Sequence, residues 1–164
     1  MGWRFWPAIA ASALLIMPAM AEETRFYWKA CDTSINWNVR IAACTVLIDD
    51  PKVTAADRAY AFFNRGFGWA QKRELDRALA DYDASINLDP NEHVYFYRGT
   101  IRASKGQVDH AIADYSEAIR LAPDFAEAYF YRSRMWRKKG DGNRAKADLD
   151  QAIRLDPKVV TAGE

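Results

Sequence analysis

The stretch "AIADYSEAIRLAP" (Ala111–Pro123) decides the fold, because close copies of it occur twice more in the chain. The copies are "ALADYDASINLDP", which ends at Pro90, and "AKADLDQAIRLDP", which ends at Pro157. Aligned on their prolines, the three strings share Ala, Ala, Asp, Ile, Leu and Pro at the same places, and the prolines are 33 and 34 residues apart. The chain therefore contains an internal repeat.

Each copy has the spacing of an amphipathic helix. In the middle copy, Ala111, Tyr115 and Ala118 fall on one face at three- and four-residue steps, whereas Asp114 and Glu117 fall on the other. The closing proline ends the helix. Upstream, "YFYRGTIRASKG" (95–106) has helical spacing too and ends in a glycine suited to a helix C-terminus. The repeated unit is predicted to be a helix, a short turn and a second helix.

A helical hairpin with this period resembles the tetratricopeptide repeat. The positions that carry the resemblance are the small eighth residue (Gly66, Gly99, Ser133), the alanine at twenty (Ala78, Ala111, Ala145), the bulky residue at twenty-four (Tyr82, Tyr115, Leu149) and the closing proline (Pro90, Pro123, Pro157). The resemblance implies an all-α superhelix of three helical hairpins over 57–90, 91–123 and 124–157, followed by a short tail to residue 164. Small residues let the two helices approach, and the bulky residue fills the space beside them.

Two positions depart from the family pattern. The aromatic residue usual at the eleventh position is present as Trp69 and Trp136, but the middle repeat has Arg102 there. The first repeat has Arg73 where Gly106 and Gly140 supply a turn glycine in the others. These differences bear on the turns and leave the expected fold unchanged.

Residues 1–21 have the pattern of a secretory signal peptide. A lone positive charge at Arg4 precedes an apolar run from about Pro7 to Met17, and "AMA" (19–21) provides a small-residue cleavage site. The alternative is an uncleaved anchor, but the apolar run is shorter than the roughly 20 residues that cross a bilayer. We expect cleavage after Ala21 and a periplasmic or secreted protein of a bacterial envelope, with no membrane insertion after cleavage.

Residues 22–56 are predicted to form an N-terminal cap, with "WNVRIAACTVLIDDP" (37–51) as its capping helix. Export permits a disulfide between Cys31 and Cys44. One continuous helix would hold these residues about 20 Å apart, so the bond needs a turn, for which Asp32, Thr33 and Ser34 are suitable. The alternative is two unpaired, partly buried thiols.

The last repeat is expected to end the array. Leu79 and Ile112 follow the recurring alanine of the first two repeats, whereas Lys146 takes that place in the third. A charge there argues for a solvated C-terminal face and against end-to-end association. We therefore expect the protein to be monomeric on its own.

Composition and motifs argue against several functions. Without residues 1–21 the chain loses Arg4, which leaves 22 basic and 22 acidic residues, and this balance gives no general reason to bind nucleic acid. The two histidines, His93 and His110, lack the spacing of metal ligands, and His110 is expected to be exposed at the start of a helix. No catalytic constellation is found, so we expect no enzyme, no metal and no cofactor.

Two charged columns recur with the repeat: Arg65, Arg98 and Arg132 at the seventh position, and Asp81, Asp114 and Asp148 at the twenty-third. They could form a ligand-binding ladder of arginines, or the two columns could pair between helices of neighbouring hairpins. Equal numbers of opposite charges at fixed offsets favour pairing.

The resemblance also implies a peptide-binding groove lined by the first helices of the hairpins. Carried over by position, its main lining residues are Tyr60, Phe63, Phe67, His93, Phe96, Thr100, Phe130, Arg134, Arg137 and Lys138. The groove would run from aromatic to basic, and a carboxylate clamp is not expected, because phenylalanines stand at most of its positions. The chain is predicted to be a non-catalytic scaffold for a protein or peptide partner; the alternative is a structural subunit of a constitutive envelope complex.

Overall fold

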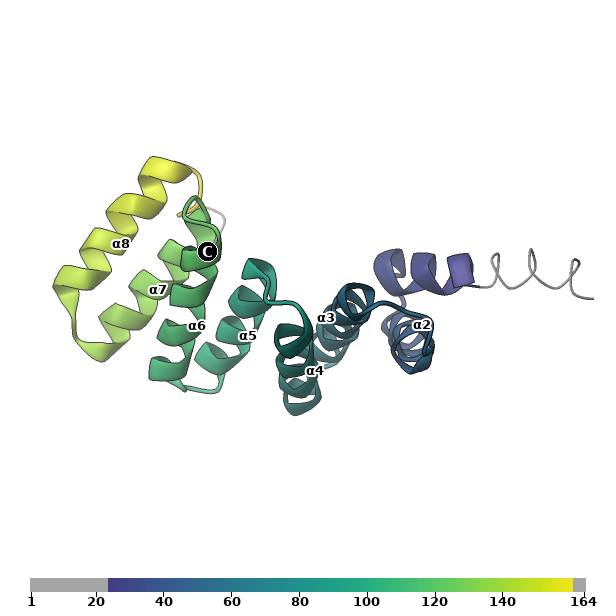
Figure 1. The fold of residues 1–164 in the computed structure, drawn as a ribbon. Helices are drawn as coiled ribbons and strands as arrows, with labels where there is room; N and C mark the ends of the chain where they lie inside the picture. Colours follow the sequence, from purple (N-terminus) through teal and green to yellow (C-terminus); the bar gives the residue numbers. More distant parts are fainter. Residues whose placement is uncertain (1–23, 161–164) are drawn as a thin grey trace, which may run out of the picture.

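The computed structural model describes residues 24–160, and this part of the chain is built from α-helices joined by short turns. A helix over residues 24–33 comes first. It is followed by α2 (Trp37–Asp49), α3 (Ala55–Gln71), α4 (Leu75–Leu88), α5 (Glu92–Ser104), α6 (Val108–Leu121), α7 (Ala126–Lys139) and α8 (Gly142–Leu155). Successive helices pair into antiparallel hairpins that stand in a row along the molecule (Figure 1). The predicted all-α array of hairpins is confirmed.

The hairpins close tightly because the eighth position is small. A Cβ atom added at Gly66 would lie 2.8 Å from the ring of Tyr82, and one added at Gly99 would lie 2.9 Å from the ring of Tyr115. Both tyrosines are fully buried, and burial raises the pKa of Tyr115 to about 12. In the first two hairpins a glycine on one helix therefore faces a tyrosine ring on the other, and the helices approach closely there.

The turns inside the hairpins share one backbone conformation. Gly106 and Gly140 have positive φ angles of 75° and 89°, and Arg73 has a φ of 65° at the equivalent place. The first hairpin thus keeps the family turn although it lacks the glycine. This left-handed conformation costs an L-residue conformational free energy, because its Cβ comes close to the following carbonyl oxygen.

The N-terminal segment contains two helices, where sequence analysis identified one. The helix over 24–33 packs on α2, and Cys31 and Cys44 are joined by a disulfide. Both cysteines are fully buried, and they form a small core with Ala43, Leu47 and Ala61. The last of these belongs to α3, so the N-terminal hairpin is fastened to the array. The proposed signal peptide lies outside the described residues.

The C-terminal end is closed partly by its tail. Lys146 is exposed and forms an ion pair with Asp150 one turn further along α8, as expected of a solvated face. Beyond Pro157, however, the buried side chain of Val159 packs with Ala126 and Ala152, a contact that the sequence pattern did not indicate. Within residues 24–160, no helix has the length and apolar character needed to cross a membrane.

Candidate functional site

Aromatic rings form a continuous chain along the first helices of the hairpins. We call it the aromatic ladder: Trp37, Phe67, Tyr97, Phe96, Tyr131 and Phe130. Ring centroids along this path are 5.9, 5.6, 5.5, 5.4 and 5.5 Å apart. Most neighbours meet edge to face, which is a favourable geometry for aromatic pairs. The ladder links α2, α3, α5 and α7.

The four phenylalanines predicted for the site lie on or beside this ladder. Phe67, Phe96 and Phe130 belong to it, and Phe63 contacts Tyr97 at 5.7 Å between ring centroids. All four are half-buried, so they support the array as well as facing outward. Each offers part of a ring to a partner.

Sequence reasoning missed Tyr97 and Tyr131, which connect the phenylalanines. Both follow a predicted site residue directly, in the string "YFYR" that occurs at residues 95–98 and again at 129–132. The exact recurrence of that string was the signal that could have identified them. The groove positions carried over from the family do not include the position that Tyr97 and Tyr131 occupy.

The N-terminal part of the site contains a small cavity of about 160 Å³ between the first two hairpins. Its lining includes Tyr60, Phe63 and His93. Tyr60 is partly exposed and its hydroxyl donates a hydrogen bond to Asp32. Partial burial of the side chain and this bond raise the pKa of Tyr60. His93 is exposed and its ring lies 5.3 Å from that of Phe125. Thr100 is turned inward, where its hydroxyl donates to the carbonyl oxygen of Phe96 at 3.0 Å.

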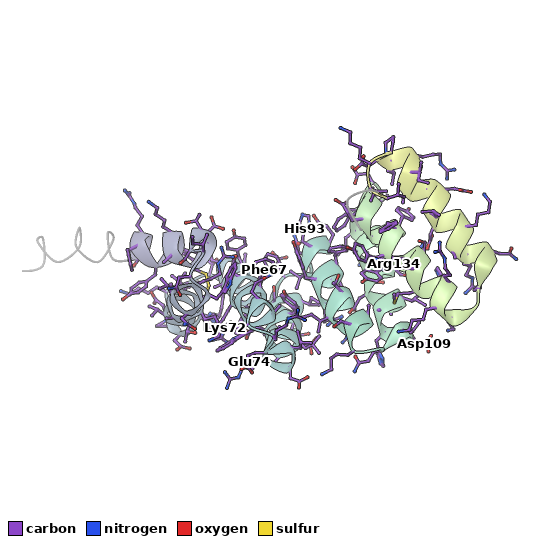
Figure 2. The ribbon with its side chains drawn as sticks, turned by 180° about the vertical axis from the view of Figure 1, so that it is seen from behind. Phe67, Lys72, Glu74, His93, Asp109 and Arg134 are labelled. Atoms are coloured by element: carbon purple, nitrogen blue, oxygen red, sulfur yellow. A yellow bond between two sulfur atoms is a disulfide. The ribbon has the colours of Figure 1, made fainter. Side chains whose placement is uncertain are left out.

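The C-terminal part is basic. Arg134, Arg137 and Lys138 are exposed and together line a cavity of about 230 Å³. The guanidinium of Arg134 lies 5.9 Å from the ring centroid of Phe130, so the basic cluster joins the end of the ladder. No carboxylate of residues 24–160 forms an ion pair with these three side chains, whereas most other cations of α5 and α7 are paired. Figure 2 shows Phe67, His93 and Arg134 spread along the array.

The charged columns pair, but within each hairpin and not between neighbours as expected. Arg65 bonds Asp81 at 2.8 Å, Arg98 bonds Asp114 at 2.7 Å, and Arg132 bonds Asp148 at 2.7 Å. The reason is geometric: the seventh position of the first helix faces the twenty-third of the second helix across the same interface that Gly66 and Gly99 keep narrow. The arginines are therefore engaged, which argues against a ligand-binding ladder.

Each of these arginines also reaches back to the preceding hairpin. The Nη1 atom of Arg65 donates to Thr45 at 3.1 Å, that of Arg98 to Asp83 at 2.6 Å, and that of Arg132 to Ser116 at 3.0 Å. Burial alone would lower the pKa of Arg98, but its bonds to Asp114 and Asp83 raise it. The columns join neighbouring hairpins through these additional bonds.

Comparison with known proteins agrees with this architecture. Residues 99–132 match the family model described as the TPR repeat, so the chain carries a tetratricopeptide repeat. The fold is similar to the crystal structure of MamA, with 20% identity over 90% of this chain and 86% of that chain and a TM-score of 0.74. No curated protein sequence matches the chain.

Two further structures of TPR proteins have a similar fold. The second TPR of Spaghetti (RPAP3), bound to the HSP90 peptide SRMEEVD, is 24% identical over 60% of this chain and 92% of that chain, with a TM-score of 0.58. YrrB, a TPR protein with an unusual peptide-binding site, is 19% identical over 93% of this chain and 88% of that chain, with a TM-score of 0.60.

In residues 24–160, no group of three or more His, Cys, Asp and Glu side chains could hold a metal ion.

Proposed function

We propose that the protein is a non-catalytic interaction scaffold that binds an acidic, partly apolar peptide segment of another protein along the aromatic ladder. The observation that carries this proposal is the cluster of Arg134, Arg137 and Lys138, which is exposed and lacks carboxylate partners in the described chain. Half-buried rings leading up to that cluster supply apolar contact area. Aromatic and arginine side chains dominate the energy of many protein interfaces.

The proposed compartment rests on two features of the N-terminal segment. A signal peptide cleaved after Ala21 and a Cys31–Cys44 disulfide both suit an oxidising envelope compartment, periplasmic or secreted. The second TPR of Spaghetti (RPAP3) bound to an HSP90 peptide and YrrB with its peptide-binding site have a similar fold, which supports the proposal by analogy. The partner is a protein segment, with no role for nucleic acid, metal or cofactor.

The proposal is tested with peptides selected from a random library on the immobilised protein. We expect selected peptides to combine apolar residues with Asp or Glu. Arg134→Glu should slow their association and flatten its salt dependence, because a rim charge mainly steers the encounter. Arg154→Glu makes the same charge change on α8 and is the matched control. Selection of basic peptides, or equal weakening by both variants, would contradict the proposal.

A second variant tests the apolar end of the site. Phe63→Ala should weaken binding of the same peptides by about 2 kcal/mol, with little dependence on salt. Because Phe63 also contacts the rings of Tyr82 and Tyr97, circular dichroism must show that the variant is folded. A partner that co-purifies in fixed ratio and never exchanges would favour the alternative, a structural subunit.

A further inference from the structure

Helix α2 is apolar on two opposite faces. Ile41, Cys44 and Leu47 are buried against the core. The opposite face carries an exposed apolar row, which we call the outer stripe: Ile35 just before the helix, then Val39, Ala42 and Val46. Ile35 is 88% exposed, Val39 44% and Val46 43%. The spacing of three and four residues places Val39, Ala42 and Val46 on one side of the helix, and Ile35 lies in the turn before it.

Such a face is unusual for a helix at the end of an array. A surface helix normally places polar residues toward water, as α8 does with Lys146 and Arg154. Adjoining exposed apolar residues generally mark a contact site. Since α2 lies at the N-terminal end of the row of hairpins (Figure 1), its outer stripe has no further hairpin to cover it in the described chain.

Charged side chains lie at both ends of α2, and Arg58 donates to the carbonyl oxygen of its C-cap, Asp50, at 3.1 Å. A helix favours acidic residues at its N-terminus and basic residues at its C-terminus. The first turn of α2 has no acidic residue and the last turn has no basic one. Instead, Lys72 approaches the N-terminal end, where its Nζ donates to Asn38 at 2.6 Å. Asp49 is exposed at the other end, and no cation of residues 24–160 forms an ion pair with it. Lys72 and Asp49 thus place opposite charges near the two ends of the helix.

The surface beside the stripe also has a hollow. A cavity of about 520 Å³ is lined by residues that include Tyr27, Val46, Asp49 and Pro51, at the C-terminal end of α2. At the N-terminal end of the same stripe, Ile35 projects into solvent. Two antiparallel copies of the stripe would bring the projection of one copy to the hollow of the other.

We propose that the outer stripe joins two copies of this protein, with their α2 helices packed antiparallel across a two-fold axis near Ala42. In that arrangement Val39 faces Val46 of the second copy, and the small Ala42 lets the helices approach. Asp49 lies near Lys72 and the helix N-terminus of the second copy, and Ile35 enters the hollow beside Val46 of the second copy. A two-fold contact uses the same patch on both copies, so association closes at two.

This inference changes the expected oligomeric state without involving the proposed peptide site. The expectation of a monomer rested on Lys146 at the C-terminal end, which remains charged and exposed. The dimer contact lies at the N-terminal end, and Arg134 and the basic cluster lie on α7. Loss of the dimer and loss of peptide binding are therefore separate outcomes.

Sedimentation equilibrium of the purified protein tests the contact. We expect a reversible dimer, and Ile35→Ser should raise its dissociation constant about tenfold, because it removes a buried apolar side chain from the interface. Ile35 is almost fully exposed in the single chain, so the fold should be unaffected. Ile153→Ser, an exposed isoleucine of α8, is the matched control and should leave the dimer intact.

Charge reversal tests the antiparallel orientation. Asp49→Lys and Lys72→Asp should each raise the dissociation constant severalfold at low salt, and the double variant should restore it, since the reversed pair attracts again. Ala42→Cys should form an intermolecular disulfide on mild oxidation, because the two copies of residue 42 meet at the axis, whereas Ile153→Cys should not.

Three results would overturn the proposal. The first is a monomer at all concentrations up to those used for structural work. The second is a dimer that Ile35→Ser and Ile153→Ser weaken equally. The third is a double charge reversal that fails to restore association, together with no cross-link at Ala42→Cys.

Discussion

The middle hairpin and its two neighbours close the same turn region with different chemistry. In the first hairpin the guanidinium of Arg77 lies 4.7 Å from the ring centroid of Trp69, and in the third Arg144 lies 4.7 Å from that of Trp136. In the middle hairpin Arg102 takes the place of the tryptophan and bonds Asp114 at 3.0 Å. The other member of the pair changes as well, since His110 stands where Arg77 stands in the first hairpin.

In the middle hairpin both side chains of the tryptophan–arginine pair are replaced together. A tryptophan needs a neighbour to cover its ring, and an arginine of the second helix does so by a cation–π contact. An arginine in the same place needs a carboxylate instead. Asp114 serves it while also bonding Arg98. The middle hairpin thus replaces a surface stack with a buried charge network.

The largest expected effect comes from removing the carboxylate of that network. Asp114→Ala should lower the free energy of unfolding by about 3–5 kcal/mol, because it leaves Arg98 and Arg102 partly buried with only the exposed Asp83 as an acidic partner. Asp148→Ala in the third hairpin should cost clearly less, since it frees only Arg132. Urea unfolding followed by circular dichroism measures both, and equal losses would remove the distinction between the hairpins.

A smaller effect should come from closing the gap between helices. Gly99→Ala should lower the free energy of unfolding by about 2 kcal/mol, because the added Cβ meets the ring of Tyr115 at 2.9 Å. Gly142→Ala is the control, since nothing lies within 4 Å of a Cβ added there. Gly66→Ala in the first hairpin should resemble Gly99→Ala. A neutral Gly99→Ala would show that the middle hairpin packs more loosely than its neighbour.

The smallest effect concerns the turn that distinguishes the first hairpin. Arg73→Gly should stabilise the protein by about 1 kcal/mol, because glycine adopts a positive φ without steric cost. The reverse change in the middle hairpin, Gly106→Ala, should destabilise it by a similar amount. Thermal unfolding shows the sign directly. If Arg73→Gly lowers the melting temperature, the side chain of Arg73 supports the turn by contacts of its own.

These contrasts also show what could be predicted from the sequence. The recurrence of Gly99 and Tyr115 at fixed spacing was enough to predict the hairpins, because helix packing is local and repeats itself. The cysteine pair was predicted as well, but its turn lies at residues 34–36, whereas Asp32 and Thr33 belong to the helix over 24–33. That helix was missed because the proline-marked repeat does not extend there.

Side-chain partners were harder to predict. Arg98 and Asp114 were expected to join neighbouring hairpins, yet both belong to one hairpin, because a periodic column has the same spacing for either choice. Tyr97 and Tyr131 were overlooked because their role depends on rings from other hairpins. The outer stripe of α2 was overlooked because sequence analysis treated this helix only as a cap, and the exposure of Val39 and Val46 is known from the structure.

The arginines that reach back give the array a direction. Arg65, Arg98 and Arg132 each bond an oxygen of the hairpin that precedes them in the chain. Because synthesis proceeds from the N-terminus, the acceptors for each of these arginines are made before the arginine itself. Shortening the chain after Pro123 leaves the bonds of Arg65 and Arg98 intact, whereas a chain beginning at Asn91 deprives Arg98 of Asp83. The two ends of the molecule are therefore unequal with respect to these bonds: removing the last hairpin spares those of the earlier arginines, whereas removing the first ones does not.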